Sequence, residues 1–129
     1  MSLPINTEAD ILDLLHSAYN MRGDNLNKSI ELSYIALSKS EELENTCLIA
    51  KSLSNLSLYH MIIADNEKAI AMAERAIKYF TLVNDELEIA KVKYNIAGVY
   101  YKTNNYHLGM FYLIAVSYTH LTLPTTPYV

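Results

Sequence analysis

The sequence has little of what disulfide-stapled or phosphate-binding folds need. Its 129 residues include one cysteine, three glycines, three prolines and no tryptophan. A single cysteine cannot form an internal disulfide, and Cys47 lies in an apolar helical pattern that favours a small buried side chain over a reactive thiol. The three glycines are far apart, so the sequence has no glycine-rich phosphate loop.

Long runs of one kind of residue are also missing. The 14 acids and 10 bases give a net charge of -4 and are spread along the chain without a basic run, so we expect no nucleic-acid partner. No apolar run approaches the roughly 20 residues that cross a bilayer, and the first residues lack the pattern of a signal peptide. With 51% apolar residues, the chain should be a folded cytoplasmic protein that does not bind a membrane.

Catalytic and metal-binding patterns are not apparent. His16, His60 and His107 are too far apart in sequence to form a metal-binding pair on one helix. The acidic clusters at 40–44 and 84–88 could suggest paired carboxylates, but each opens an expected helix, where the helix dipole favours negative charge. We therefore predict no enzyme, no cofactor and no metal site.

The chain resembles itself after a shift of forty residues. Residues 49–55, IAKSLSN, fall on residues 89–95, IAKVKYN, with Ile, Ala, Lys and Asn in common. The same shift places small residues on small residues at several points. These pairs are Ser29 with Ala69, Ala36 with Ala76, Ser57 with Ala97, and Ala69 with Gly109.

Each forty-residue period contains two amphipathic segments, with apolar residues three and four apart and a short polar turn between them. The spacing of Thr7 and Asp10, and of Asp85 and Glu88, is that of side chains that cap the first turn of a helix. Helices are expected at 7–21, 26–41, 45–63, 67–82, 86–102 and 106–114.

The recurring small residues predict how these helices pack. Two antiparallel helices approach closely only where side chains are short, and we expect Ala69, Ala76, Ala97 and Gly109 at such contacts. A single helical hairpin cannot bury its apolar face, so successive hairpins must stack. The predicted fold is an all-α, right-handed solenoid of antiparallel helix pairs with about two and a half to three repeats.

Residues 94–114, YNIAGVYYKTNNYHLGMFYLI, resemble the tetratricopeptide repeat (TPR). Ala97, Tyr100, Tyr106 and Gly109 occupy four of its characteristic positions, and Tyr100, Tyr106 and Tyr112 are expected in the core. The second repeat matches less well. In the first, His16 stands where a small residue is expected, and the turn must be one residue longer.

The resemblance is to the forty-residue variety of the repeat, which is found before output domains in bacterial signalling proteins. It divides the chain into a leader at 1–6 and a repeat domain at 7–114. The repeats span about 7–44, 45–84 and a truncated 85–114, followed by a segment at 115–129.

The resemblance also implies a binding groove lined by the first helix of each pair. Lys51 with Asn55, and Lys91 with Asn95, would form two stacked donor pairs able to hold a peptide carboxylate or backbone carbonyls. The alternative is that these side chains are simply solvated. Tyr94, Tyr101 and Lys102 complete the candidate peptide-binding residues.

The last fifteen residues, AVSYTHLTLPTTPYV, differ from the rest in having no charged residue, and they contain two prolines. One nucleotide sequence that encodes residues 116–125 resembles the transposon end and adapter used in tagmentation sequencing. We interpret 115–129 as a non-native tail whose first residues extend the last helix by accident; a genuine strand or linker is the alternative.

These observations leave two classes of function. The first is a protein-interaction scaffold, the N-terminal repeat region of a longer bacterial signalling protein with a diguanylate or adenylate cyclase, histidine kinase or transcriptional regulator as output. The second is a stand-alone TPR adaptor that assembles with itself or binds peptide ends. In both, a protein or peptide partner occupies the groove, and the uncovered apolar C-terminal end favours self-association.

Overall fold

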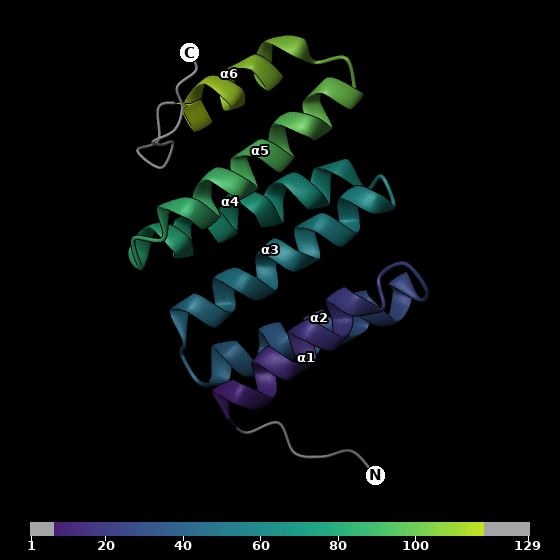
Figure 1. Ribbon diagram of the computed structural model, residues 1–129, viewed down its shortest axis with the longest axis vertical. Coiled ribbons are helices and arrows are strands. Elements are labelled where there is room, and N and C mark those ends of the chain that lie inside the picture. Colours follow the sequence, from purple (N-terminus) through teal and green to yellow (C-terminus); the bar gives the residue numbers. More distant parts are fainter. Residues whose placement is uncertain (1–6, 118–129) are drawn as a thin grey trace.

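The computed structural model describes residues 7–117, and this part of the chain is entirely helical, with no β-strand (Figure 1). Each helix packs against the next, an arrangement consistent with an α-solenoid. The six helices are α1 (Glu8–Asn20), α2 (Leu26–Glu42), α3 (Thr46–Ile62), α4 (Asn66–Leu82), α5 (Glu86–Lys102) and α6 (Tyr106–Ser117). All six expected helices are present, and none of their ends differs from the expected position by more than three residues.

The predicted cap at the start of α1 is confirmed. Thr7 accepts a hydrogen bond from the Asp10 amide, and the Asp10 carboxylate accepts one from the Thr7 amide, so both free amides are satisfied. At α5 only half of the expected pattern forms. The Asp85 carboxylate caps the amide of Glu88, whereas the Glu88 carboxylate lies 3.2 Å from the ammonium of Lys91.

Four of the five turns share one geometry. Their middle residues, Glu44, Ala64, Asn84 and Asn104, have φ angles of 54°, 62°, 56° and 63°. In each turn the following amide reaches back five residues, as in the bond of 3.1 Å from the Asn45 amide to the Ser40 carbonyl. This is the left-handed helix end that satisfies the last carbonyls and reverses the chain within three residues. The regular turn fixes how successive helices meet.

The core consists of two clusters of buried side chains. Its main cluster joins α3, α4 and α5 through large buried side chains such as Leu53, Phe80 and Ile96, none of which is accessible to solvent. A smaller cluster around Ile11 and Leu15 fills the space between α1, α2 and α3. Each helix pair therefore completes its core only by packing on the next pair, as the forty-residue pattern predicts.

The predicted small-residue contacts are confirmed. Ala69, Ala76, Ala97 and Gly109 are all buried. Gly109 shows the reason most directly, because a Cβ atom built on it would lie 2.7 Å from the ring of Tyr101 on α5. The helices α5 and α6 thus meet at a point where any side chain would collide.

His16 does not lie at the helix contact of the first repeat, where a small residue is expected. His16 is exposed, and the small residue at the contact of α1 with α2 is Ala18, which is fully buried. The carbonyl of Ala18 accepts a hydrogen bond from the hydroxyl of Ser29 on α2. The helix ends soon after this contact, and a five-residue turn at 21–25 replaces the usual three residues.

Two of the three tyrosines expected in the core are partly buried. Tyr100 and Tyr112 stack with their ring centroids 5.8 Å apart and pack against the main cluster. The expectation for Tyr106 is wrong, since 58% of this residue is exposed and its hydroxyl bonds to Asn104 in the preceding turn.

At the C-terminal end, α6 continues three residues past the expected limit of the repeat domain, to Ser117. The rest of the segment interpreted as a non-native tail, 118–129, lies outside the described residues, as does the leader at 1–6. Within 7–117, none of the helices is both long enough and apolar enough to span a bilayer.

Candidate functional site

The face that carries the candidate binding residues is formed by α1, α3 and α5, which we call the front face. Figure 1 shows α3 between α1 and α5, and α3 contacts both of them. The front face is not flat, because hollows lie on either side of α3. Two of them contain most of the side chains that the sequence marks as binding candidates.

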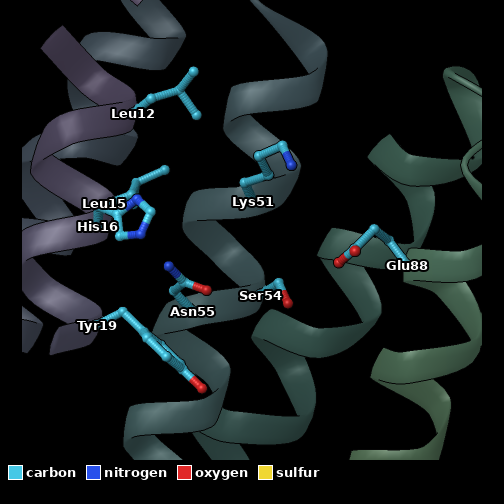
Figure 2. Close-up of a pocket in the computed structure, with 8 residues that line it drawn as sticks. All are labelled: Leu12, Leu15, His16, Tyr19, Lys51, Ser54, Asn55 and Glu88. Carbon is cyan, nitrogen blue, oxygen red and sulfur yellow. The ribbon is translucent and has the colours of Figure 1, made fainter. Parts of the chain in front are cut away.

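The first hollow, the Lys51 hollow, lies where α1, α3 and α5 come together and has a volume of about 240 Å³. Figure 2 shows side chains of α1 on one side, α3 in the middle and Glu88 of α5 pointing toward α3 from the other side. The lining residues are Leu12, Leu15, His16, Tyr19, Lys51, Ser54, Asn55 and Glu88.

Charges of both signs line the Lys51 hollow. The ammonium of Lys51 and the carboxylate of Glu88 belong to different helices, and the amide of Asn55 lies one turn beyond Lys51 on α3. At the rim, the guanidinium of Arg22 lies 3.6 Å from the ring centroid of Tyr19. This mixture of donors, an acceptor and an aromatic ring suits a polar peptide segment better than an apolar ligand.

The second hollow, the Gly98 hollow, lies between the C-terminal halves of α3 and α5 and has a volume of about 230 Å³. It is more apolar than the first, with Lys102 as its charged lining residue. The residues that line it are Leu58, Met61, Ile62, Asn66, Tyr94, Asn95, Gly98, Val99 and Lys102.

Gly98 has no structural need to be glycine. Its φ angle is not positive, and a Cβ atom built on it would meet no atom within 4 Å. Glycine inside a helix costs about 1 kcal/mol relative to alanine. Gly98 therefore lowers helix stability without allowing any contact in this chain, in contrast to Gly109, which lies under the ring of Tyr101.

A third hollow, of about 400 Å³, separates α5 from the end of α6. Its lining includes Lys91 and Asn95 of α5 and Val116 of α6. The ammonium of Lys91 is held by Glu88, one turn earlier on the same helix, at 3.2 Å.

The two Lys/Asn pairs are therefore placed differently. Lys51 and Asn55 line the hollow shared with α1, whereas Lys91 and Asn95 line the one that faces α6. Each pair lies on one helix face, as its spacing predicts, but the described hollows do not join the pairs into one donor cluster.

The remaining predicted residues are split between the front face and the α6 contact. Tyr94 is 63% exposed, and it lines the Gly98 hollow together with Lys102. Tyr101 packs against α6, over Gly109 and with its ring centroid 5.7 Å from that of Tyr106.

Sequence analysis did not select the α1 side of the Lys51 hollow. The sequence places His16 at a packing position of the first repeat and Glu88 in a helix cap, whereas both line this hollow. A register that placed Ala18 at the helix contact would have turned His16 toward the front face. The signal that could have found it is the alternation of Ile11, Leu15 and Ala18, each of which is buried.

A titratable pair lies away from the front face, between α2 and α3. The buried imidazole of His60 has its Nε2 atom 3.2 Å from the hydroxyl of Tyr34, and its Nδ1 atom 3.8 Å from the carboxylate of Asp65. Burial lowers the pKa of His60 below its usual 6.5, the positive charge of Lys68 lowers it further, and Asp65 opposes both. At neutral pH the ring is uncharged, which suits its buried position.

Residues 7–117 contain no group of three or more His, Cys, Asp or Glu side chains that could hold a metal ion. Comparison of the chain with protein-family models, with curated proteins and with solved structures finds no match.

Proposed function

We propose that this protein is a protein-interaction scaffold that binds a peptide segment of a partner along the front face. In this proposal the stack is a right-handed solenoid of TPR-type repeats, and the protein works in the cytoplasm and has no catalytic activity of its own in this region. The bound segment extends over the Lys51 hollow and the Gly98 hollow.

The observation that carries the proposal is the pair of hollows on either side of α3. Helices held by two buried apolar clusters and by four turns of one geometry provide a rigid surface, so little entropy is lost when a partner binds to it. The side chains that line the Lys51 hollow offer hydrogen-bond donors and an acceptor without a metal or cofactor. Such a surface suits recognition of an extended or helical peptide.

We further propose that the chain is the N-terminal repeat region of a longer bacterial signalling protein, whose output domain is a cyclase, a histidine kinase or a transcriptional regulator. The forty-residue period supports this assignment, because the sequence pattern resembles that variety of repeat.

A stand-alone adaptor that assembles with itself is the second candidate. It is favoured by α6, which has no charged residue and has exposed apolar side chains such as Phe111, 62% of which is accessible. The complete open reading frame distinguishes the two.

The test of peptide binding is selection of random peptides displayed on phage against the purified chain. Lys51→Ala should weaken the binding of the selected peptides by about 1.5 to 3 kcal/mol, because a charge-assisted hydrogen bond is lost. Lys91→Ala should have a smaller effect, since Glu88 already holds that ammonium. Isothermal titration measures both.

The matched control is Lys78→Ala, which removes an exposed lysine from α4, outside the lining of the described hollows. It should leave affinity unchanged. If Lys51→Ala and Lys78→Ala bind the selected peptides equally well, the front face is not the binding surface and the proposal fails.

A further inference from the structure

We infer that the Gly98 hollow is a socket for one large apolar side chain of the bound peptide, and that Lys102 at its rim pairs with an acidic residue beside that anchor. This inference rests on the proposed function, since it assigns a preference to part of the same front face. It concerns a different place from the Lys51 hollow and different chemistry.

Gly98 is the first argument. A glycine in the interior of a helix destabilises the fold, and neither the backbone conformation of Gly98 nor a neighbouring atom requires it. Glycine also occurs where a ligand must approach the backbone closely. The open space above its Cα atom belongs to the hollow itself, so the missing side chain is what makes the socket deep.

The walls of the hollow are the second argument. Leu58, Met61 and Val99 supply apolar surface, and Met61 is an unbranched side chain that adapts to different partners. The volume of about 230 Å³ is below the roughly 300–1,000 Å³ of small-molecule sites. It is suited to a single anchoring side chain rather than to a cofactor.

Charge at the rim selects the partner. Within the described chain, Lys102 is exposed at the end of α5 and has no ion-pair partner, and no acid lines the hollow. The amides of Asn66 and Asn95 can bond to the peptide backbone on either side of the anchor. The expected ligand is therefore a peptide in which a Leu, Ile, Met or Phe is next to Asp or Glu.

The experiment uses peptides selected from a random phage-displayed library on the wild-type chain. The sequences should share a large apolar residue next to an acid. Gly98→Leu should lower the affinity for these peptides at least tenfold, because the introduced side chain occupies the socket. Ala71→Leu is the matched control, since it adds the same side chain to an exposed position on α4, and its affinity should stay within twofold of wild type.

Stability and binding should move in opposite directions at this position. Gly98→Ala should raise the melting temperature by about 3 to 6 °C, because alanine is the better helix former and meets nothing in this chain. The same change should weaken peptide binding. A rise in melting temperature with unchanged affinity would overturn the inference.

Direct contact between the peptide and the Gly98 hollow can be tested by NMR through the methyl signal of Met61. The methyl signal of Met110 on α6 is the internal control. Addition of the peptide should change the chemical shift of the Met61 methyl group and leave that of the Met110 methyl group unchanged.

The variants separate the two proposals. If Lys51→Ala loses affinity for the peptide and Gly98→Leu keeps it, the proposed function stands and the socket is ruled out. A library that yields no binding peptide would end both. An oligomer of this chain that Gly98→Leu dissociates would assign the socket to a second copy and overturn the peptide assignment.

Discussion

Helices α2 and α4 occupy the same place in successive repeats, yet they fill their buried contacts with different chemistry. α2 uses mostly serine where α4 uses alanine or phenylalanine, and every one of these residues is buried. The matched positions are Ser29 and Ala69, Ser33 and Ala73, Ala36 and Ala76, and Ser40 and Phe80. Three of the four positions therefore hold a small residue in both helices, and at two of these three either serine or alanine is found.

The serines show what makes a buried hydroxyl acceptable. Ser29 donates to the carbonyl of Ala18 at 2.5 Å, and Ser40 donates to that of Ala36 at 2.7 Å. Ser33 donates to no backbone carbonyl. Its hydroxyl and that of Tyr59 are both buried without a well-formed hydrogen bond, although the two are near each other: burial raises the pKa of Tyr59 and Ser33 lowers it. A buried hydroxyl thus has little cost where a backbone carbonyl is within reach, and a larger cost where none is.

The largest expected effect comes from adding side-chain volume at a buried helix contact. Ala76→Leu in α4 and Ala36→Leu in α2 should each lower the free energy of unfolding by about 1 to 3 kcal/mol, because both alanines are fully buried at helix contacts. Urea unfolding measures the change. Ala71→Leu, on the exposed side of α4, is the control and should change stability by less than about 0.5 kcal/mol. Equal costs at positions 71 and 76 would show that the contact does not need a small residue.

The next effect is the loss of a needed hydroxyl. Ser29→Ala gives α2 the residue that α4 has, but it leaves the Ala18 carbonyl at the end of α1 without its bond from Ser29. We expect a loss of about 1 to 2 kcal/mol in the free energy of unfolding. The reverse exchange in α4, Ala69→Ser, is the companion measurement. If Ser29→Ala is neutral, the hydrogen bond to Ala18 does not hold α1 against α2.

The opposite sign is expected four residues later. Ser33→Ala also gives α2 the residue of α4, but here it removes a hydroxyl that makes no well-formed hydrogen bond and has the Tyr59 hydroxyl as its nearby polar group. Stability should stay the same or rise by up to about 1 kcal/mol. A clear loss of stability in urea would mean that the Ser33 hydroxyl is satisfied in solution, for example by a bound water.

The contrast between these helices also shows what the sequence could predict. The forty-residue pattern predicted every helix and the burial of Ala69, Ala76, Ala97 and Gly109, because a repeated contact leaves a repeated small residue. It did not predict the exposure of His16 in α1, a helix of 13 residues against 17 in α3, followed by a turn of five residues instead of three. Sequence spacing cannot separate these two changes, whereas packing can.

The candidate site was less predictable than the fold. The residues on one helix face followed from spacing: Lys51 and Asn55 line one hollow together, and Tyr94 and Lys102 line another. The approach of Glu88 of α5 to Lys51 of α3, and the position of Tyr101 over Gly109, depend on how α5 meets its neighbours. Such contacts between helices leave no periodic signal in the sequence.

The smallest expected effect is a pH dependence at the contact of α2 with α3. Tyr34 and His60 meet there, whereas the equivalent positions of α4 and α5 hold Glu74 and Tyr100. Burial lowers the pKa of His60 in the folded protein below the 6.5 expected when the chain unfolds, and Lys68 adds to this. The unfolded state therefore binds more protons once the pH falls below about 6.5. The contribution of His60 to stability is complete above that pH and is lost as the pH falls toward the pKa of His60 in the folded protein.

The variant His60→Gln tests this, because it keeps a polar side chain that does not titrate. Between about pH 7.5 and pH 5.5 the urea midpoint of the wild-type protein should fall further than that of His60→Gln, because both proteins share every other titrating group. Equal shifts in the two midpoints would mean that the Tyr34–His60 contact does not distinguish the two states of the ring, and the two helix contacts would then respond to pH alike.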